Sequence, residues 1–206
     1  MKHQRLTPGQ IIGHLTVVLV FFCTLTVTAV SAGGLSALFP VSDADISALS
    51  PVDGEGYGYR IVYRVPVDVD TFWRFKTDFD NDFLIQNKTI TSHRLLRRHN
   101  NIAVTETTYA AAPGKHFTWE TTTDIDNYQM QFRLIDPRSS GQRYHWGFIQ
   151  LIRDGHQTIV VQQAYFDFTG AGFWVVYPWQ GGMRDVLKTN AAWEQEAIMR
   201  MQAAYR

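Results

Sequence analysis

Apolar and polar residues alternate with a period of two through most of the middle of this chain. The first such stretch is YGYRIVYRV at 57–65, and the same alternation recurs in six stretches between Lys88 and Thr169. Turn sequences such as Asp154-Gly155 separate these stretches. Alternation predicts half-buried β-strands, and consecutive strands joined by short turns pair antiparallel. We therefore expect a seven-stranded antiparallel sheet.

The segment after the first strand changes to helical spacing. In DVDTFWRFKTDFDNDFLIQ, Asp68 or Asp70 can cap a short helix that carries apolar residues at 72, 73 and 75. A second short helix would carry Phe79, Phe83 and Leu84. We expect two short helices between the first strand and the other six.

A long helix is predicted at the C-terminus, over Leu187–Tyr205. Ala, Glu, Gln and Met dominate there, with no Gly or Pro. The apolar residues recur at helical spacing and form a stripe: Met183, Leu187, Ala191, Ile198, Met201 and Tyr205. At about 100° per residue, Asn190 and Glu194 fall inside this stripe. An amide and a carboxylate on a face that should be buried require an explanation.

The order of these elements, together with the Gly-rich entry into the last helix (YPWQGGMRDVLKTNAAWE), resembles the START-like or SRPBCC superfamily, in particular its polyketide cyclase and lipid-transport members. The resemblance covers about Gly56 to Arg206 and is architectural, so no catalytic residue is carried over from it. It implies an α+β helix-grip fold, in which a seven-stranded curved antiparallel sheet wraps around the C-terminal helix. It also implies a cavity between sheet and helix that binds hydrophobic or amphipathic small molecules.

Such a cavity gives the two polar residues of the helix a role. Ligand sites are mostly apolar with a few placed polar groups, so we expect Asn190 and Glu194 to bind the polar end of a ligand, beside Leu187 and Ile198. The alternative is that Glu194 pairs with an arginine or reaches water, because buried carboxylates usually find partners.

Strand alternation adds candidate lining residues, each of which has plain core packing as its alternative. The apolar candidates are Tyr59, Ile61, Tyr63, Phe117, Trp119, Tyr128, Met130, Phe132, Trp146, Phe148, Ala164 and Phe166. Glu106 and Gln162 are polar residues on apolar strand faces, and each is either a ligand contact or a partner in an internal hydrogen bond. The same alternation predicts that His145 faces outward. Trp174, Tyr177 and Trp179 lie in the loop before the helix, which forms either a lip at the cavity mouth that touches a membrane or a wedge against the sheet edge.

Composition narrows the function classes. The formal net charge is zero, which argues against a nucleic-acid partner. Cys23 is the single cysteine and lies in the N-terminal apolar run. The five histidines after residue 32 show no metal-ligand spacing, so we expect no metal and no cofactor.

The N-terminus predicts export. Lys2, His3 and Arg5 precede an uncharged apolar run that ends in VSAGG, which indicates a signal peptide over residues 1–32, cleaved after Ala32. An uncleaved membrane anchor is the alternative, and both place the remainder in the periplasm or outside the cell. Residues 33–55 predict a linker or loose arm, and 56–206 the START-like domain.

Three functions remain open at this stage. The first is an exported protein that binds or transports a lipid or isoprenoid-like molecule without chemistry. The second is a small cyclase or hydrolase that uses Glu194 or Glu106 as a base. The third is a structural envelope protein whose aromatic side chains fill the core.

Overall fold

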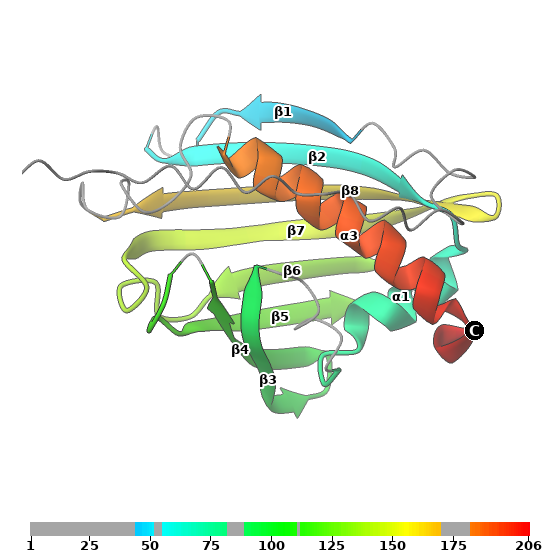
Figure 1. The fold of residues 1–206 in the computed structure, drawn as a ribbon, viewed down its shortest axis with the longest axis horizontal. Coiled ribbons are helices and arrows are strands. Elements are labelled where there is room, and N and C mark those ends of the chain that lie inside the picture. Colours follow the sequence, from blue (N-terminus) through cyan, green and yellow to red (C-terminus); the bar gives the residue numbers. More distant parts are fainter. Residues whose placement is uncertain (1–43, 52–54, 82–88, 111, 170–181) are drawn as a thin grey trace, which may run out of the picture. The chain divides into compact units, whose positions relative to one another are not determined.

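A computed structural model describes residues 44–51, 55–81, 89–110, 112–169 and 182–206 of the 206-residue chain. These residues form one antiparallel sheet and two helices (Figure 1). The strands are β1 (Asp45–Leu49), β2 (Tyr57–Val65), β3 (Ile90–His99), β4 (Ile102–Tyr109), β5 (Phe117–Asp124), β6 (Gln129–Leu134), β7 (Gln142–Asp154) and β8 (Gln157–Phe168). The helices are α1 (Val69–Thr77) and α3 (Gly182–Tyr205).

The sheet has eight strands in the order β1-β2-β8-β7-β6-β5-β4-β3, one more than the sequence predicts. The additional strand is β1, which pairs antiparallel with β2 inside the segment expected to be a loose arm. It is an edge strand with largely exposed side chains. Its backbone hydrogen bonds with β2 define it as a strand. Its side chains are not divided between a buried and an exposed face, so apolar and polar residues do not alternate along it. The other seven strands and their antiparallel pairing agree with the prediction.

Residues that accept unusual backbone angles mark the turns between strands. Asn100 has a φ of 51° between β3 and β4, and Gly155 a φ of 62° between β7 and β8. Positive φ is tolerated by glycine and, among other residues, best by asparagine and aspartate. The turn expected at Asp154-Gly155 therefore lies between β7 and β8, where the sequence predicts it.

One short helix, α1, follows β2 in the described part of the chain. Asp68 caps it, since its carboxylate accepts a hydrogen bond from the Thr71 backbone N–H at 2.9 Å. Phe72, Trp73 and Phe75 are buried on one face of the helix. Two short helices were expected, but Phe79 lies in a turn instead, and Phe83 and Leu84 lie outside the described residues.

The helix α3 runs diagonally across one face of the sheet, with α1 beside its C-terminal half (Figure 1). Ala197 and Ile198 in this half are buried in a core with α1 and with residues of β2, β7 and β8. Val186, Leu187 and Asn190 in the other half lie against a cavity. The C-terminal half of α3 therefore packs against the hydrophobic core, whereas its N-terminal half borders the cavity.

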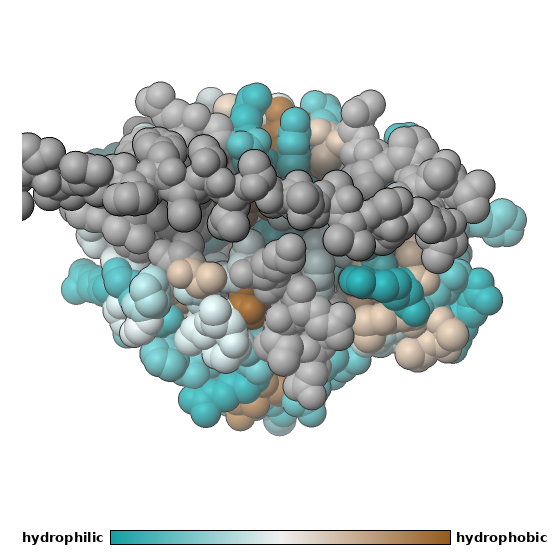
Figure 2. All heavy atoms as spheres, in the orientation of Figure 1, coloured by the Kyte–Doolittle hydropathy of each residue, from teal (hydrophilic) through white to brown (hydrophobic). Residues whose placement is uncertain are grey.

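The surface is mixed in character. On the face drawn in Figure 2, hydrophilic and hydrophobic residues are interspersed among those that are coloured. Neither described helix is both long enough and apolar enough to cross a membrane, and the apolar run at the N-terminus lies outside the described residues.

Candidate ligand cavity

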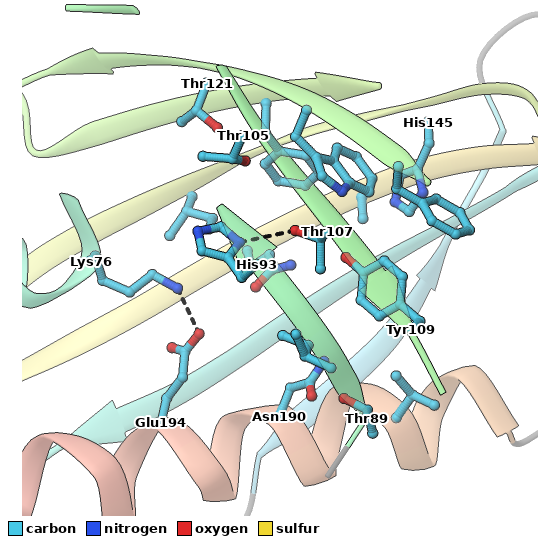
Figure 3. Close-up of a pocket in the computed structure, with 18 of the residues that line it drawn as sticks. Lys76, Thr89, His93, Thr105, Thr107, Tyr109, Thr121, His145, Asn190 and Glu194 are labelled. Atoms are coloured by element: carbon cyan, nitrogen blue, oxygen red, sulfur yellow. Dashed lines mark hydrogen bonds and ion pairs between the residues drawn. The ribbon is translucent and has the colours of Figure 1, made fainter. Parts of the chain in front are cut away.

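A cavity of about 410 Å³ lies between the first half of α3 and the inner face of the sheet (Figure 3). This volume is within the range of small-molecule sites, roughly 300 to 1,000 Å³. Its walls come from α1, α3, β3, β4, β5, β6, β7 and β8. The apolar wall includes Phe75, Phe79, Ile90, Phe117, Trp119, Met130, Phe132, Ile149, Ala164, Phe166, Leu187 and Ala191.

The polar groups of the cavity sit in a few places on this apolar wall. The threonines 105 and 107 of β4 and Thr121 of β5 face the interior, with His93 of β3 and His145 of β7 on the same side (Figure 3). Asn190 and Glu194 face them from α3, one helical turn apart. An apolar cavity with a few separated polar groups suits a molecule that is itself mostly apolar.

Glu194 is held by two partners from distant parts of the chain. The ammonium Nζ of Lys76, in α1, lies 2.6 Å from Glu194 Oε1, and the hydroxyl of Tyr63, in β2, donates a hydrogen bond to Oε2. Both charged side chains are only 14% exposed. The Glu194 carboxylate, which lies within the apolar stripe of α3, therefore connects α3 to α1 and β2 through these two contacts. The partner is a lysine, whereas the sequence alternative named an arginine.

Tyr63 is a donor at all ordinary pH values. Burial raises the pKa of its phenol well above the usual value, and the neighbouring Glu194 carboxylate raises it further. A phenolate here would lie in apolar surroundings beside another negative charge, so the neutral form is favoured. Tyr63 belongs to the core and is absent from the cavity wall.

His93 is an interior imidazole with both ring nitrogens occupied. Its Nε2 lies 3.1 Å from the Phe79 carbonyl oxygen and its Nδ1 lies 3.0 Å from the Thr107 hydroxyl. A carbonyl only accepts, so Nε2 carries the hydrogen and Nδ1 accepts from Thr107 in the neutral ring. Burial lowers the pKa of His93. The residue joins β3 to β4 and to the turn after α1.

The prediction that His145 faces outward is wrong. It lines the cavity and lies among three rings in edge-to-face or tilted contacts, with its ring centroid 4.8 Å from Trp119, 5.4 Å from Phe166 and 6.2 Å from Phe132. Its neighbour in the inward series is Gly147, where an added Cβ would lie 2.6 Å from the Phe132 side chain. The Phe132 ring occupies the space over Gly147, so this inner face of β7 has one histidine and one glycine where an apolar pattern would place large residues.

The remaining aromatic residues of β7 lie on the other side of the sheet. Trp146 is 36% exposed and stacks on Tyr165 at 4.6 Å, and neither Trp146 nor Phe148 lines the cavity. Their assignment to the interior was wrong, because outer-face stacking between neighbouring strands also favours large aromatic residues.

Glu106 was also assigned to the wrong face. Its carboxylate lies 2.8 Å from Arg94 and 3.3 Å from the imidazole of His116, which are both largely exposed, and it is absent from the cavity wall. Thr105, Thr107 and Tyr109 line the cavity from the opposite face of β4. The expectation that the more apolar face of a strand points inward fails for β4, because the inner face of this strand meets a cavity and not a packed core.

The other predicted positions divide into three groups. Leu187, Asn190, Glu194, Trp119, Met130, Phe132, Gln162 and Phe166 line the cavity, and ligand contact at these residues stays a prediction. Ile198 and Tyr63 lie in the packed core, and the half-buried Tyr59 stacks on Phe166 at 6.1 Å without lining the cavity. Trp174, Tyr177 and Trp179 lie outside the described residues.

Sequence reasoning missed several wall residues: Lys76, His93, Thr105, Thr107, Thr121 and His145. The sequence contains one pattern that could have identified some of them. In IAVTETTY, Thr105 and Thr107 alternate in step with Tyr109, so all three point to the same face of the strand. Within the described residues, no group of three His, Cys, Asp or Glu side chains converges to hold a metal ion.

Comparison with solved structures identifies the architecture. A fragment of a STAR-related lipid transfer protein from Xanthomonas axonopodis matches with a TM-score of 0.57 and 13% identity, over 77% of this chain and 96% of that fragment. The Zhui aromatase/cyclase from Streptomyces sp. R1128 matches with a TM-score of 0.54 and 14% identity, over 78% and 98%. The chain has the START/SRPBCC fold. This confirms the resemblance expected from the order of elements.

A START superfamily protein from Mycobacterium smegmatis matches the START/SRPBCC fold of this chain as well, with a TM-score of 0.53 and 14% identity over 70% of this chain and 98% of that one. No family model and no curated protein matches the sequence. At this level of identity the likeness establishes the fold alone.

Gly147 provides a first test of the cavity geometry. Substitution by alanine places a Cβ 2.1 Å from the Gln163 carbonyl oxygen and 2.6 Å from the Phe132 ring, so backbone and ring must both move. We expect Gly147→Ala to lower the free energy of unfolding by about 2 kcal/mol, as overpacking does. Gly155→Ala is the comparison, since its Cβ meets no atom within 4 Å and only its φ of 62° opposes it. Urea unfolding measures both, and an equal or smaller loss in Gly147→Ala would contradict the close packing of Phe132 on β7.

Proposed function

We propose that the protein binds one hydrophobic or amphipathic small molecule in this cavity and carries it without chemical change. The observation that carries the proposal is an open volume of about 410 Å³ inside a START/SRPBCC fold, with aromatic and aliphatic walls. A lipid or isoprenoid-like molecule of moderate size suits this volume. Exchange of the molecule at a membrane, following export directed by the N-terminal segment, completes the proposal.

The two alternatives have less support. A hydrolase or cyclase that used Glu194 as its base would need a free carboxylate, but Lys76 and Tyr63 occupy both oxygens of this one. Glu106 lies on the other face of β4. A structural protein with a filled core would have no such cavity.

The test is native mass spectrometry of the protein as its own cell delivers it, purified without detergent. We expect a reproducible added mass that extracts into organic solvent. Leu187→Trp, which fills the cavity from α3, should abolish the added mass. Lys188→Trp places the same side chain on the exposed face of the helix and should retain it.

Two results would contradict the proposal. One is a wild-type protein that carries no added mass and takes up none from a total lipid extract. The other is an added mass that persists unchanged in Leu187→Trp, because the molecule would then bind elsewhere.

A further inference from the structure

His145 lines the cavity and is hydrogen-bonded through only one of its two ring nitrogens within the described part of the chain. The Nδ1 of this ring lies 3.1 Å from Oε1 of Gln142, a residue that is almost fully buried. An amide oxygen accepts hydrogen bonds, so Nδ1 carries the hydrogen of the neutral imidazole. The other nitrogen, Nε2, then has a free lone pair. No described residue donates a hydrogen bond to it.

The ring stays neutral, and its remaining exposed surface faces the cavity. Burial lowers the pKa of His145 to about 4, so Nε2 is an acceptor at neutral pH. The side chain is half-buried yet surrounded by Trp119, Phe132 and Phe166. It is a wall residue of the cavity (Figure 3). A ligand that donates a hydrogen bond to Nε2 in these mostly apolar surroundings gains a net contribution of about 1 kcal/mol.

The charges of the wall indicate which ligands are excluded. The single cationic side chain among the described wall residues is Lys76, and Glu194 neutralises it at 2.6 Å. Asp78, the other charged wall residue, accepts a hydrogen bond from the Tyr205 hydroxyl at 2.7 Å. The two histidines are neutral. A carboxylate or phosphate headgroup would therefore find no unpaired cation here, and its desolvation would be uncompensated.

We infer that His145 determines specificity by accepting a hydrogen bond, at Nε2, from the hydroxyl group of a neutral, ring-containing ligand. The hydroxyl is that of a phenol or a cyclic alcohol. The three aromatic rings around His145 form an apolar site for the flat body to which that hydroxyl is attached. This inference rests on the proposed function and adds the chemical class of the molecule carried.

The experiment compares two probes that differ in one hydrogen-bond donor. 2-Naphthol donates through its hydroxyl, whereas 2-methoxynaphthalene has the same ring system and cannot donate. Calorimetric titration of the full protein at pH 7 should show about tenfold tighter binding of 2-naphthol. His145→Phe keeps an aromatic ring and removes the acceptor, so the affinity ratio should fall to about one through weaker 2-naphthol binding.

Two further variants control for indirect effects. His145→Gln replaces the ring by an amide with an acceptor oxygen and should recover part of the ratio. His156→Phe makes the same chemical change at an exposed position in the turn between β7 and β8 and should keep the full ratio.

Each outcome has a separate meaning. If the ratio persists in His145→Phe while both probes bind, the hydroxyl inference is overturned and the cavity remains a binding site. Equal affinities of the two probes in the wild-type protein would overturn it in the same way. If neither probe binds the wild-type protein and no mass co-purifies with it, the proposed function fails and the inference fails with it.

Discussion

Replacing Glu194 by leucine is expected to lower the free energy of unfolding by about 3 kcal/mol, because the Lys76 ammonium would remain enclosed without its counter-charge. The two groups lie 2.6 Å apart and each side chain is 14% exposed. The substitution also removes the acceptor of the Tyr63 hydroxyl, which is buried. Urea unfolding at neutral pH measures the loss.

A matched ion pair on the surface provides the control. Arg133 and Glu120 also lie 2.6 Å apart, but Arg133 is 66% exposed, so water replaces the lost partner in Glu120→Leu. We expect that variant to lose less than about 1 kcal/mol. The double variant Lys76→Met with Glu194→Leu should be more stable than Glu194→Leu alone, since no unpaired charge remains. Equal losses in Glu194→Leu and Glu120→Leu would contradict the role assigned to the enclosed pair.

Acid is expected to destabilise the protein through His145. Its pKa is about 4 in the folded state, against an ordinary value of 6.5. Between these values the unfolded chain binds the proton more tightly, so stability falls as the pH falls from about 6.5 to about 4. The contribution of this one group should make the free energy of unfolding about 2 kcal/mol lower at pH 4.5 than at pH 7. Burial lowers the pKa of His93 as well and adds a loss of the same sign.

The measurement compares urea unfolding of the wild-type protein and of His145→Gln at the two pH values. Carboxylates titrate in both proteins, so their effect cancels in the difference. We expect the variant to lose less stability on acidification. An identical pH dependence in the two proteins would contradict the lowered pKa of the His145 ring.

The strands show how much of the fold can be predicted from residues that are close together in the sequence. Seven of the eight strands of the described sheet, their antiparallel pairing and the C-terminal helix follow from alternation, turn residues such as Asn100 and Gly155, and helix-forming composition. These signals are readable because side-chain alternation and turn geometry involve residues close in sequence. The stripe of the helix likewise placed Leu187, Asn190 and Glu194 on the cavity side.

The tertiary structure alone decided what these faces meet. Glu194 is neutralised by a lysine 118 residues away, and no local pattern specifies such a partner. The inward face of β4 carries threonines because it meets the cavity. The inward face of β7 carries His145, which also lines the cavity, and Gly147, which leaves room for the Phe132 ring of the neighbouring strand. The alternation of apolar and polar residues distinguishes the two faces of a strand, and a prediction from it assumes that the more apolar face is buried. Where a sheet encloses a cavity that assumption fails, since the free energy of burial depends on neighbours brought together only by folding.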